Sequence, residues 1–478
     1  MRLEKSLFNK FMEYAIGSGL SLIIGLITSP IITRLISPEE YGKSSMFGVV
    51  VSVSTIILAL GLDQSFVRFY YEEKEEARNK LLMKALMISL ITSFLFSLIL
   101  LEFKEKITIY LFNEYDINII ILIIINIVIS IVNRYAFLVI RLHQNGKFYS
   151  YLQVVQKILT IILVLIFFLK LGDDYKVIII SGTFANIIIS LIAIKKYNKF
   201  WFKKINKKVK LKNSTKDMLL YGIPLMCTGV ISWAFQSIDK VFIKNMCDYR
   251  EVGLYTSAFT IIALLNQIQT TFLNFWVPVA YEHYEKDKED KEFFINVFNI
   301  LSMVMLFISM LIIIFKNLII MFLGSQYREA SYIVPFLIFM PLMNTVSEVT
   351  VMGIGFKKKA NYHIYITTIC CIFNIITNYL IIPLLGAKGA AITTGITYII
   401  YFVLRTNIGA KFFAVNYDLK RFYKCIFLLT INIIYVTFKK IDIISIFMGV
   451  SMILLLIKYY KKEIKFIINK VIFMKNKS

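Results

Sequence analysis

The sequence predicts an all-α integral membrane protein with about fourteen transmembrane helices. Two observations support this fold class. First, 58% of the 478 residues are hydrophobic, and the mean hydropathy is +0.71. Second, the apolar residues gather in runs of about 20, the length that spans a bilayer, and short charged gaps separate these runs. A soluble domain of this length would need more polar side chains to cover its surface, so lipid is the expected solvent.

The apolar runs define the predicted helices, because about 20 residues at about 1.5 Å each cross the hydrocarbon core. The last two runs are shorter and follow a cationic stretch, so twelve helices is the alternative. The fourteen runs are residues 14–36, 44–66, 81–101, 118–140, 149–171, 175–194, 218–238, 254–279, 293–315, 332–354, 362–384, 387–412, 422–438 and 443–459.

The charge is strongly positive, at +24 with an isoelectric point of about 9.6. In a soluble protein this excess would indicate nucleic acid. Here the cations lie in the short gaps, so an anionic phospholipid membrane and membrane topology explain them, and no nucleic-acid partner is expected. Alternate gaps are richer in Lys and Arg, which by the positive-inside rule predicts cytoplasmic N- and C-termini.

The most basic gap, residues 195–216, holds ten lysines and no acid. It is either a basic amphipathic segment on an anionic leaflet or a loop that fixes topology, and in both cases it divides the chain. The predicted domains are an N-lobe (1–200, helices 1–6), a basic cytoplasmic linker (201–216), a C-lobe (217–415, helices 7–12), and helices 13–14 with a basic cytoplasmic tail (416–478).

Similar sequences precede the second and the eighth helix. Residues 33–42 read TRLISPEEYG, and residues 243–253 read IKNMCDYREVG. In each copy a cation ends a helix, a short polar turn follows, and a Gly opens the next apolar run. The copies are six helices apart, an even number, so they share one orientation. This predicts a parallel repeat about an axis along the membrane normal.

Longer motifs surround these turns: PIITRLISPEEYG at 30–42, GLDQSFVRFY at 61–70, YGIP at 221–224, SIDK at 237–240 and VGLY at 252–255. With them the chain resembles the oligosaccharide (O-antigen or polysaccharide) flippase family. That family lies within the multidrug/oligosaccharidyl-lipid/polysaccharide exporter superfamily. The resemblance extends from about the first to the twelfth helix.

The resemblance implies two pseudo-symmetric six-helix lobes around a central cavity, alternating access, and no ATP hydrolysis. It implies a bacterial plasma membrane flippase that moves an isoprenoid-diphosphate-linked oligosaccharide from the cytoplasmic to the outer leaflet for cell-surface polysaccharide biosynthesis. Other polysaccharide-assembly membrane proteins are the further partners expected. No cofactor is expected, and coupling to an H+ or Na+ gradient stays open.

Two cations stand inside predicted helices, where an ionisable group costs about 2.5–3.5 kcal/mol on insertion scales. Arg134 lies on helix 4 beside Asn133, and Lys157 lies on helix 5 beside Gln156. At about 1.5 Å per residue, both cations lie roughly 10–12 Å from the predicted cytoplasmic end. These four residues form an inward-facing site for the diphosphate of the cargo, or the two cations snorkel to the inner interface.

Glu348 lies on helix 10 at nearly the repeat-equivalent depth of Arg134. Two interpretations are open. Glu348 is either a proton or cation site that couples transport to a gradient, or one half of an interhelical salt bridge.

Five further charged residues lie near helix ends: Arg34, Asp63, Arg68, Asp239 and Lys240. Spacing alone leaves them as interfacial anchors, gate salt bridges or cargo contacts. The resemblance places helices 1, 2, 7 and 8 around the cavity. It therefore implies that Arg34, Arg68 and Lys240 contact cargo, and that Asp63 and Asp239 act in coupling or gating.

The sequence has no P-loop, HExxH or GxSxG motif, and its His and Cys residues are not spaced as metal ligands, so neither an enzyme nor a metal site is expected. An ion-coupled multidrug exporter is the first alternative function, but such a protein should favour acids where this N-lobe has Arg134 and Lys157. A membrane glycan polymerase or ligase is the second, and the short predicted outer gaps argue against it.

Overall fold

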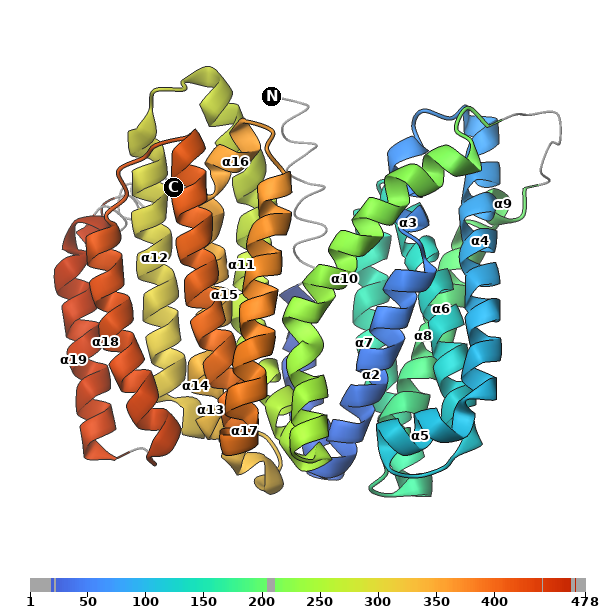
Figure 1. Cartoon of the computed structure of the whole chain (residues 1–478), viewed down its shortest axis with the longest axis horizontal. Helices are drawn as coiled ribbons and strands as arrows, with labels where there is room; N and C mark the ends of the chain where they lie inside the picture. The colour runs from blue at the N-terminus through green and yellow to red at the C-terminus, as the bar shows by residue number, and fades with distance from the viewer. Residues whose placement is uncertain (1–18, 21–22, 204–210, 441, 466–468, 470–478) are drawn as a thin grey trace. The chain divides into compact units, whose positions relative to one another are not determined.

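A computed structural model describes residues 19–20, 23–203, 211–440, 442–465 and 469 (Figure 1). Parts of three predicted segments lie outside the described residues: the start of the first helix, the middle of the basic linker and most of the cytoplasmic tail.

The chain divides into two compact units. The N-terminal unit comprises Met1–Lys244 and Asp248–Gly253, and the C-terminal unit comprises Asn245–Cys247 and Leu254–Ser478. The helix that opens the predicted C-lobe therefore packs with the N-terminal unit. The units reflect contacts, whereas the predicted lobes reflect a sequence repeat, so the lobe boundaries stay a prediction.

The N-terminal unit is built around α6. Its apolar residues Ile123, Ile127, Ile131 and Tyr135 recur every fourth position and are buried, which gives the helix one continuous core face. α6 packs against α2, α4 and α8, and the short α5 lies across the ends of α4 and α6 (Figure 1). The helices are Ile23–Leu35, α2 (Pro38–Leu58), α3 (Leu62–Phe69), α4 (Glu75–Glu102), α5 (Lys104–Phe112), α6 (Ile117–Leu142), α7 (Gly146–Leu171), α8 (Lys176–Lys196), α9 (Asn198–Trp201) and α10 (Thr215–Met246).

The second predicted helix, 44–66, is interrupted rather than continuous. Leu60 and Gly61 have φ values of 50° and 66°, which separate α2 from α3. Gly61 is required there, because a Cβ would lie 2.0 Å from the carbonyl oxygen of Gly222 on α10. The carbonyl of Leu58, freed by the break, accepts a hydrogen bond of 2.7 Å from Thr92 Oγ1. The break places Asp63 in the first turn of α3.

The C-terminal unit contains a second interrupted segment. The predicted run 332–354 is divided into Val334–Leu337, Phe339–Thr350 and Met352–Phe356. The short helix Ser325–Tyr332 that precedes it meets Val334–Thr350 at a bend of 56°. The first residues of α11, as far as Gly253, belong to the N-terminal unit. The helices of the C-terminal unit are α11 (Tyr249–Lys286), α12 (Lys291–Ile314), α13 (Lys316–Met321), η1 (Ser325–Tyr332), α14 (Val334–Leu337), α15 (Phe339–Thr350), α16 (Met352–Phe356), α17 (Asn361–Phe412), α18 (Leu419–Phe438) and α19 (Ile443–Tyr459).

α17 covers two predicted runs, 362–384 and 387–412. Gly386 has φ 58° and ψ −139°, outside the helical region, so the two segments meet there. They lie against each other, because Thr393 Oγ1 donates a hydrogen bond to Asn378 Oδ1. The boundary predicted between these two runs is therefore confirmed.

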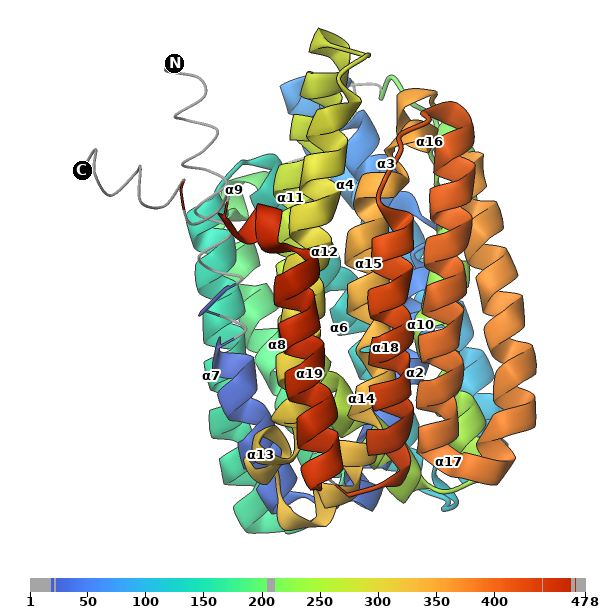
Figure 2. The same cartoon turned by 90° about the vertical axis from the view of Figure 1, so that its left-hand side faces the viewer.

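The two C-terminal helices predicted from the shorter runs are present as α18 and α19. They lie side by side next to α12 (Figure 2). The buried Lys316 donates a hydrogen bond from Nζ to the carbonyl oxygen of Val436, in the last turn of α18. This contact satisfies a carbonyl that the end of the helix leaves free.

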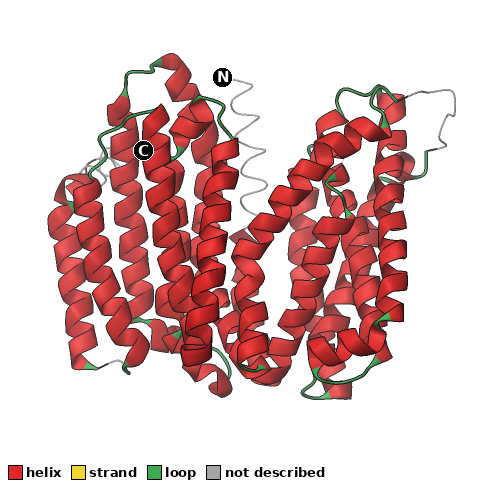
Figure 3. Cartoon of the chain, viewed as in Figure 1, coloured by secondary structure: helices red, strands yellow, loops and turns green. Residues whose placement is uncertain are grey.

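Every element in the described part of the chain is helical, as Figure 3 shows, so the predicted all-α membrane class is confirmed. Within the described residues, nine helices are long and apolar enough to cross a membrane, or ten with the bent pair. Ile23–Leu35 and α19 are shorter apolar helices. The choice between fourteen and twelve spans stays a prediction.

Candidate functional site

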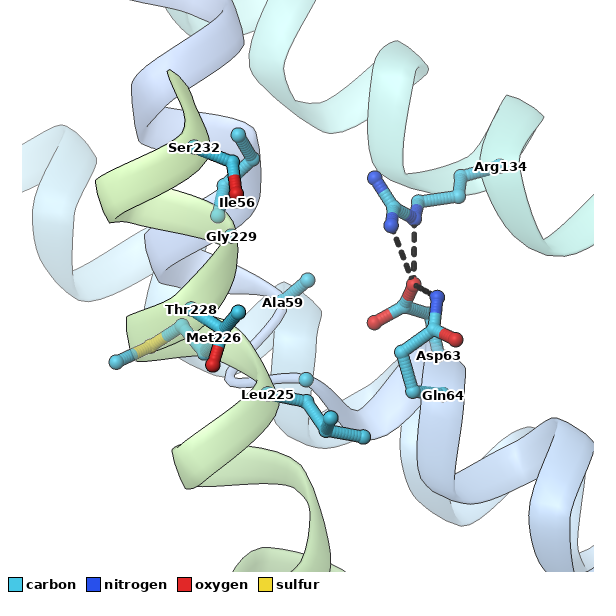
Figure 4. Close-up of a pocket in the computed structure, with 11 residues that line it drawn as sticks. Ile56, Ala59, Asp63, Gln64, Arg134, Leu225, Met226, Thr228, Gly229 and Ser232 are labelled. Atoms are coloured by element: carbon cyan, nitrogen blue, oxygen red, sulfur yellow. Dashed lines mark hydrogen bonds and ion pairs between the residues drawn. The ribbon is translucent and has the colours of Figure 1, made fainter. Parts of the chain in front are cut away.

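A cavity of about 340 Å³ lies within the N-terminal unit, beside the break between α2 and α3. Figure 4 shows its walls: Arg134 from α6 points at Asp63 on α3, and a stretch of α10 lies on the other side of the view. The lining residues are Ile56, Ala59, Gly61, Asp63, Gln64, Arg134, Leu225, Met226, Thr228, Gly229 and Ser232.

An ion pair between Arg134 and Asp63 is the main polar feature of this cavity. Nε and Nη2 of Arg134 each lie 2.6 Å from Asp63 Oδ2, and Gln64 Nε2 donates to the same oxygen at 2.8 Å. The side chain of Asp63 is 2% exposed, whereas that of Arg134 is 40% exposed. The cation therefore faces the open side of the pair, with its counter-charge held behind it.

Arg134 keeps hydrogen-bonding capacity beyond this pair. A guanidinium carries five N–H donors, and the contacts to Asp63 use two of them. The remaining N–H groups and the positive charge can receive an anion that enters the cavity.

Neutral side chains complete the polar lining. Thr228 and Ser232 on α10 lie four residues apart, one helical turn, so they share a face with Leu225. Neither these two residues nor Gln64 were predicted as site residues from the sequence. The helical spacing of Leu225, Thr228 and Ser232 indicates a common face of one helix. It does not indicate which other helix that face packs against.

Two contacts, one near the start of α10 and one in its middle, hold this helix beside α2 and α3. Ser65 Oγ donates to the carbonyl of Met218 at 2.6 Å, and Trp233 Nε1 donates to Ser52 Oγ at 2.9 Å. Gly222 permits the close approach, because a Cβ there would lie 2.7 Å from the carbonyl oxygen of Leu60. These contacts fix the wall of the cavity opposite Arg134.

The other predicted members of the Arg134 site lie beside it rather than on the cavity wall. Gln156 and Asn133 both donate hydrogen bonds to Asn186 of α8, at 2.5 and 3.5 Å. The antiparallel α6 and α7 thus bring positions 133 and 156 to one residue of α8. Lys157 is exposed on α7 and contacts no described partner, so its role as a cargo contact or a snorkelling cation stays a prediction.

Glu348 forms an interhelical salt bridge, one of the two roles that its position in the sequence left open. Arg405 Nη1 on α17 lies 2.8 Å from Glu348 Oε1 on α15, and it also donates to Ser347 Oγ at 2.7 Å. The side chain of Arg405 is only 5% exposed. A coupling role for Glu348 stays a prediction.

The remaining predicted residues do not line the cavity described above. Arg68 is exposed and pairs with Glu72 one turn on, and Arg34 is exposed on the first helix. Asp239 is fully buried in α10, next to the partly buried Lys240. Their cargo, coupling and gating roles stay predictions.

The two repeated turns found in the sequence lie against each other. A Cβ on Gly42 of α2 would lie 1.9 Å from the carbonyl oxygen of Tyr249, and a Cβ on Gly253 of α11 would lie 1.8 Å from that of Pro38. The contacts are reciprocal, because Pro38 and Tyr249 hold matching positions, each four residues before its Gly. Both glycines are needed for this approach.

A polar contact fastens the same region to α5. Lys244 Nζ donates to the carbonyl of Tyr110 and lies 4.1 Å from the centroid of its ring. The hydroxyl of Tyr249 donates to the carbonyl of Leu111 at 2.5 Å. Both acceptors are carbonyls that the end of α5 leaves free, so the turn between α10 and α11 caps that helix.

The fold is that of transporters of the MOP superfamily. The structure resembles the lipid II flippase MurJ in an inward closed conformation, with a TM-score of 0.71 at 17% identity, covering 94% of this chain and 99% of that one. It resembles an inward-facing multidrug resistance MATE transporter with a TM-score of 0.60 at 15% identity (86% and 99% covered). A MOP superfamily transporter from Pyrococcus furiosus gives 0.56 at 14% identity (84% and 95% covered).

The sequence places the chain more narrowly than the fold does. A family model described as polysaccharide biosynthesis protein matches residues 8–283, more than half of the chain. The chain belongs to this family, which confirms the resemblance found in the sequence. No curated protein sequence gives a significant match.

Proposed function

We propose that this chain is a flippase that moves an isoprenoid-diphosphate-linked oligosaccharide from the cytoplasmic to the outer leaflet of the bacterial plasma membrane by alternating access. Its family and its transporter fold support this function. The observation that carries the proposal is Arg134, a cation within a predicted span that faces a cavity while its carboxylate partner is buried.

The cargo has a head group that hydrocarbon excludes. A diphosphate is anionic and hydrated, and moving it through the core without compensation is prohibitively unfavourable. Arg134 supplies a positive charge and free N–H donors, and guanidinium groups match phosphate oxygens in geometry. Gln64, Thr228 and Ser232 supply neutral hydrogen bonds beside it.

Asp63 has a defined part in this arrangement. Its carboxylate holds the guanidinium in place and offsets its charge. A diphosphate competes with this carboxylate for Arg134, so binding stays weak enough for release on the other side.

The cavity has a volume of about 340 Å³, near the lower end of the range of about 300–1,000 Å³ typical of ligand pockets. It accommodates the diphosphate with an adjoining sugar rather than a long glycan. Within this proposal the lipid tail stays in the bilayer. We propose a secondary-type transporter without a cofactor, driven by an H+ or Na+ gradient through buried acids such as Asp239 or Glu348.

Transport by the purified full-length chain in proteoliposomes tests the function. We expect it to flip an undecaprenyl diphosphate that carries a short oligosaccharide, measured by access of an external glycosidase. Arg134→Ala should lower the rate at least about tenfold, because charge-assisted hydrogen bonds contribute about 1.5–3 kcal/mol. Arg134→Lys should retain part of the rate.

Two controls keep this test decisive. Asp63→Asn combined with Arg134→Gln removes both charges, so lost transport there cannot come from an unpaired buried carboxylate. Efflux of a cationic dye tests the multidrug alternative. Dye export without lipid flipping, or full flipping in the Arg134→Ala protein, would contradict the proposed function.

A further inference from the structure

Three amide side chains from three helices meet in the N-terminal unit, and one of them, Asn133, directly precedes Arg134 in α6. Asn133 of α6 and Gln156 of α7 both donate to one atom, Oδ1 of Asn186 on α8. We call Asn133, Gln156 and Asn186 the amide cluster. All three side chains are partly exposed, although each lies inside a predicted span. Polar groups at such positions are costly unless they meet a partner.

The amide cluster leaves much of its hydrogen-bonding capacity unused. Each amide has two N–H donors and a carbonyl oxygen that can accept two bonds. Both internal contacts end on Oδ1 of Asn186. The carbonyl oxygen of Asn133 is buried and has no partner in the described part of the chain. Within the same residues, the carbonyl oxygen of Gln156 and the amide nitrogen of Asn186 are also without a bond.

A second polar contact between α6 and α8 shows what a purely structural pair looks like. Asn126, seven residues before Asn133, is buried, and its amide nitrogen donates to Leu122 O at 2.9 Å and to Thr183 Oγ1 at 2.7 Å. Thr183 in turn donates to Ile179 O. Both protons of that amide nitrogen are therefore used. The same two helices thus carry one buried contact in which both amide protons are used and one partly exposed contact that leaves amide donors unused.

The chemistry of the free groups fits a sugar. The carbonyl acceptor of Gln156 and the amide donor of Asn186 complement a pair of adjacent hydroxyls, because each hydroxyl both donates and accepts a hydrogen bond. The cluster carries no charge, so it adds no general attraction for an anion. Its effect would be selective, because a site built to bond hydroxyls disfavours a ligand that lacks them.

The position of the amide cluster links it to the proposed cargo. Asn133 adjoins Arg134, which faces the cavity, and Gln156 adjoins the exposed Lys157. Neighbouring Cα atoms lie about 3.8 Å apart, and adjacent side chains on a helix point about 100° apart. The amide cluster therefore lies on the face of α6 next to that of Arg134, within reach of an oligosaccharide whose diphosphate is bound at Arg134.

We propose that the amide cluster is a sugar-binding subsite that selects the glycosylated form of the cargo, with Asn186 as the residue that organises it. This inference rests on the proposed flippase function. Arg134 then binds the diphosphate of any such lipid, whereas the amide cluster binds the hydroxyls of the sugars nearest the diphosphate.

Two cargo lipids separate the two roles. Proteoliposomes of the full-length chain receive undecaprenyl diphosphate either bare or carrying a short oligosaccharide. We expect Asn186→Ala to slow flipping of the glycosylated lipid at least about fivefold, the effect of one or two lost hydrogen bonds. The rate for the bare lipid should not change. Arg134→Ala should slow both lipids equally.

Matched variants guard against a folding effect. Asn126→Ala removes the structural contact between the same helices, and we expect it to change the two rates by the same factor. Asn186→Asp keeps the shape of the side chain and replaces its donor by an acceptor, so it should also discriminate between the lipids. The melting temperature of each variant in detergent reports whether the fold survives.

The outcomes distinguish the subsite from the function. If the unaltered chain flips neither lipid, the proposed function fails and the subsite fails with it. If it flips both lipids and the two Asn186 variants slow them equally or not at all, the function stands and the subsite is refuted.

Discussion

Two ion pairs, Arg134–Asp63 in the N-terminal unit and Arg405–Glu348 in the C-terminal unit, use the same chemistry in opposite surroundings. In the N-terminal unit the cation is open to a cavity, because Arg134 is 40% exposed and Asp63 only 2%. In the C-terminal unit the cation is enclosed, because Arg405 is 5% exposed and Glu348 16%. The exposed fraction of the cation, rather than its presence in a helix, separates a binding candidate from a structural contact.

The surroundings of the two arginines reinforce the difference. Nη1 of Arg405 donates hydrogen bonds to Glu348, Ser347 and Asn344, all on α15. Arg134 bonds a single oxygen of Asp63 and retains donors that face the cavity. The first arrangement ties two helices together, and the second leaves a cation available to a ligand.

The largest effect is expected from Arg405→Ala. This change leaves Glu348 largely buried without its cation, which typically costs about 3–5 kcal/mol. We expect the melting temperature in detergent to fall sharply and little folded protein to reach the membrane. The measurement is thermal unfolding followed by size-exclusion chromatography of the purified chain.

A matched double variant tells whether the pair is structural. Arg405→Met with Glu348→Leu removes both charges at similar volume, and replacing a buried ion pair in this way is often neutral. Recovered stability with retained transport would support the structural role. A stable double variant without transport would instead return Glu348 to its predicted coupling role.

The next effect concerns the interruption between α2 and α3 that positions Asp63. Gly61→Ala places a Cβ 2.0 Å from the Gly222 carbonyl at a φ of 66°. We expect a loss of about 1–3 kcal/mol in stability from the forced backbone shift. Gly48→Ala, in regular α2 with nothing within 4 Å of its Cβ, is the control and should be neutral. Equal effects of both changes would show that the break does not depend on Gly61.

A smaller effect is expected from Ser347→Ala. The change removes one hydrogen bond of 2.7 Å to Arg405, while Glu348 and Asn344 stay in place. Such a bond contributes about 1 kcal/mol net. We expect a modest decrease in the melting temperature and an unchanged transport rate. Lost transport with an intact melting temperature would show that the C-terminal pair acts in transport.

The sequence predicted the elements well where a regular pattern decides them. The helix positions follow apolar runs, and the boundary between the runs that form α17 was correct because Gly386 separates them. The break at Gly61 was missed, because its cause is the approach of Gly222, some 160 residues later in the chain. Propensity within one segment carries no information about such an approach.

The candidate site was predictable only in part, for the same reason. A cation in an apolar run signals a special position, so Arg134 was found, but its pairing with Asp63 depends on how α3 and α6 pack. Asn186 gave no charge signal and was missed, although Asn133 and Gln156 both bond to it. The reciprocal contact of Gly42 and Gly253 shows that the sequence repeat has a physical counterpart.

The finest test of the comparison is Asp63→Asn, with Glu348→Gln as its counterpart. Asn is isosteric with Asp and keeps a carbonyl acceptor for Arg134, so we expect little change in the melting temperature. The charge of Arg134 is no longer offset, so the affinity for pyrophosphate, used as a head-group probe, should rise several-fold. Slower release should then reduce the flipping rate. Glu348→Gln should leave pyrophosphate affinity unchanged, because Arg405 does not line the described cavity. Weaker pyrophosphate binding in the Asp63→Asn protein would mean that the carboxylate positions Arg134 rather than competing for it, and the contrast between an open and a closed pair would then be wrong.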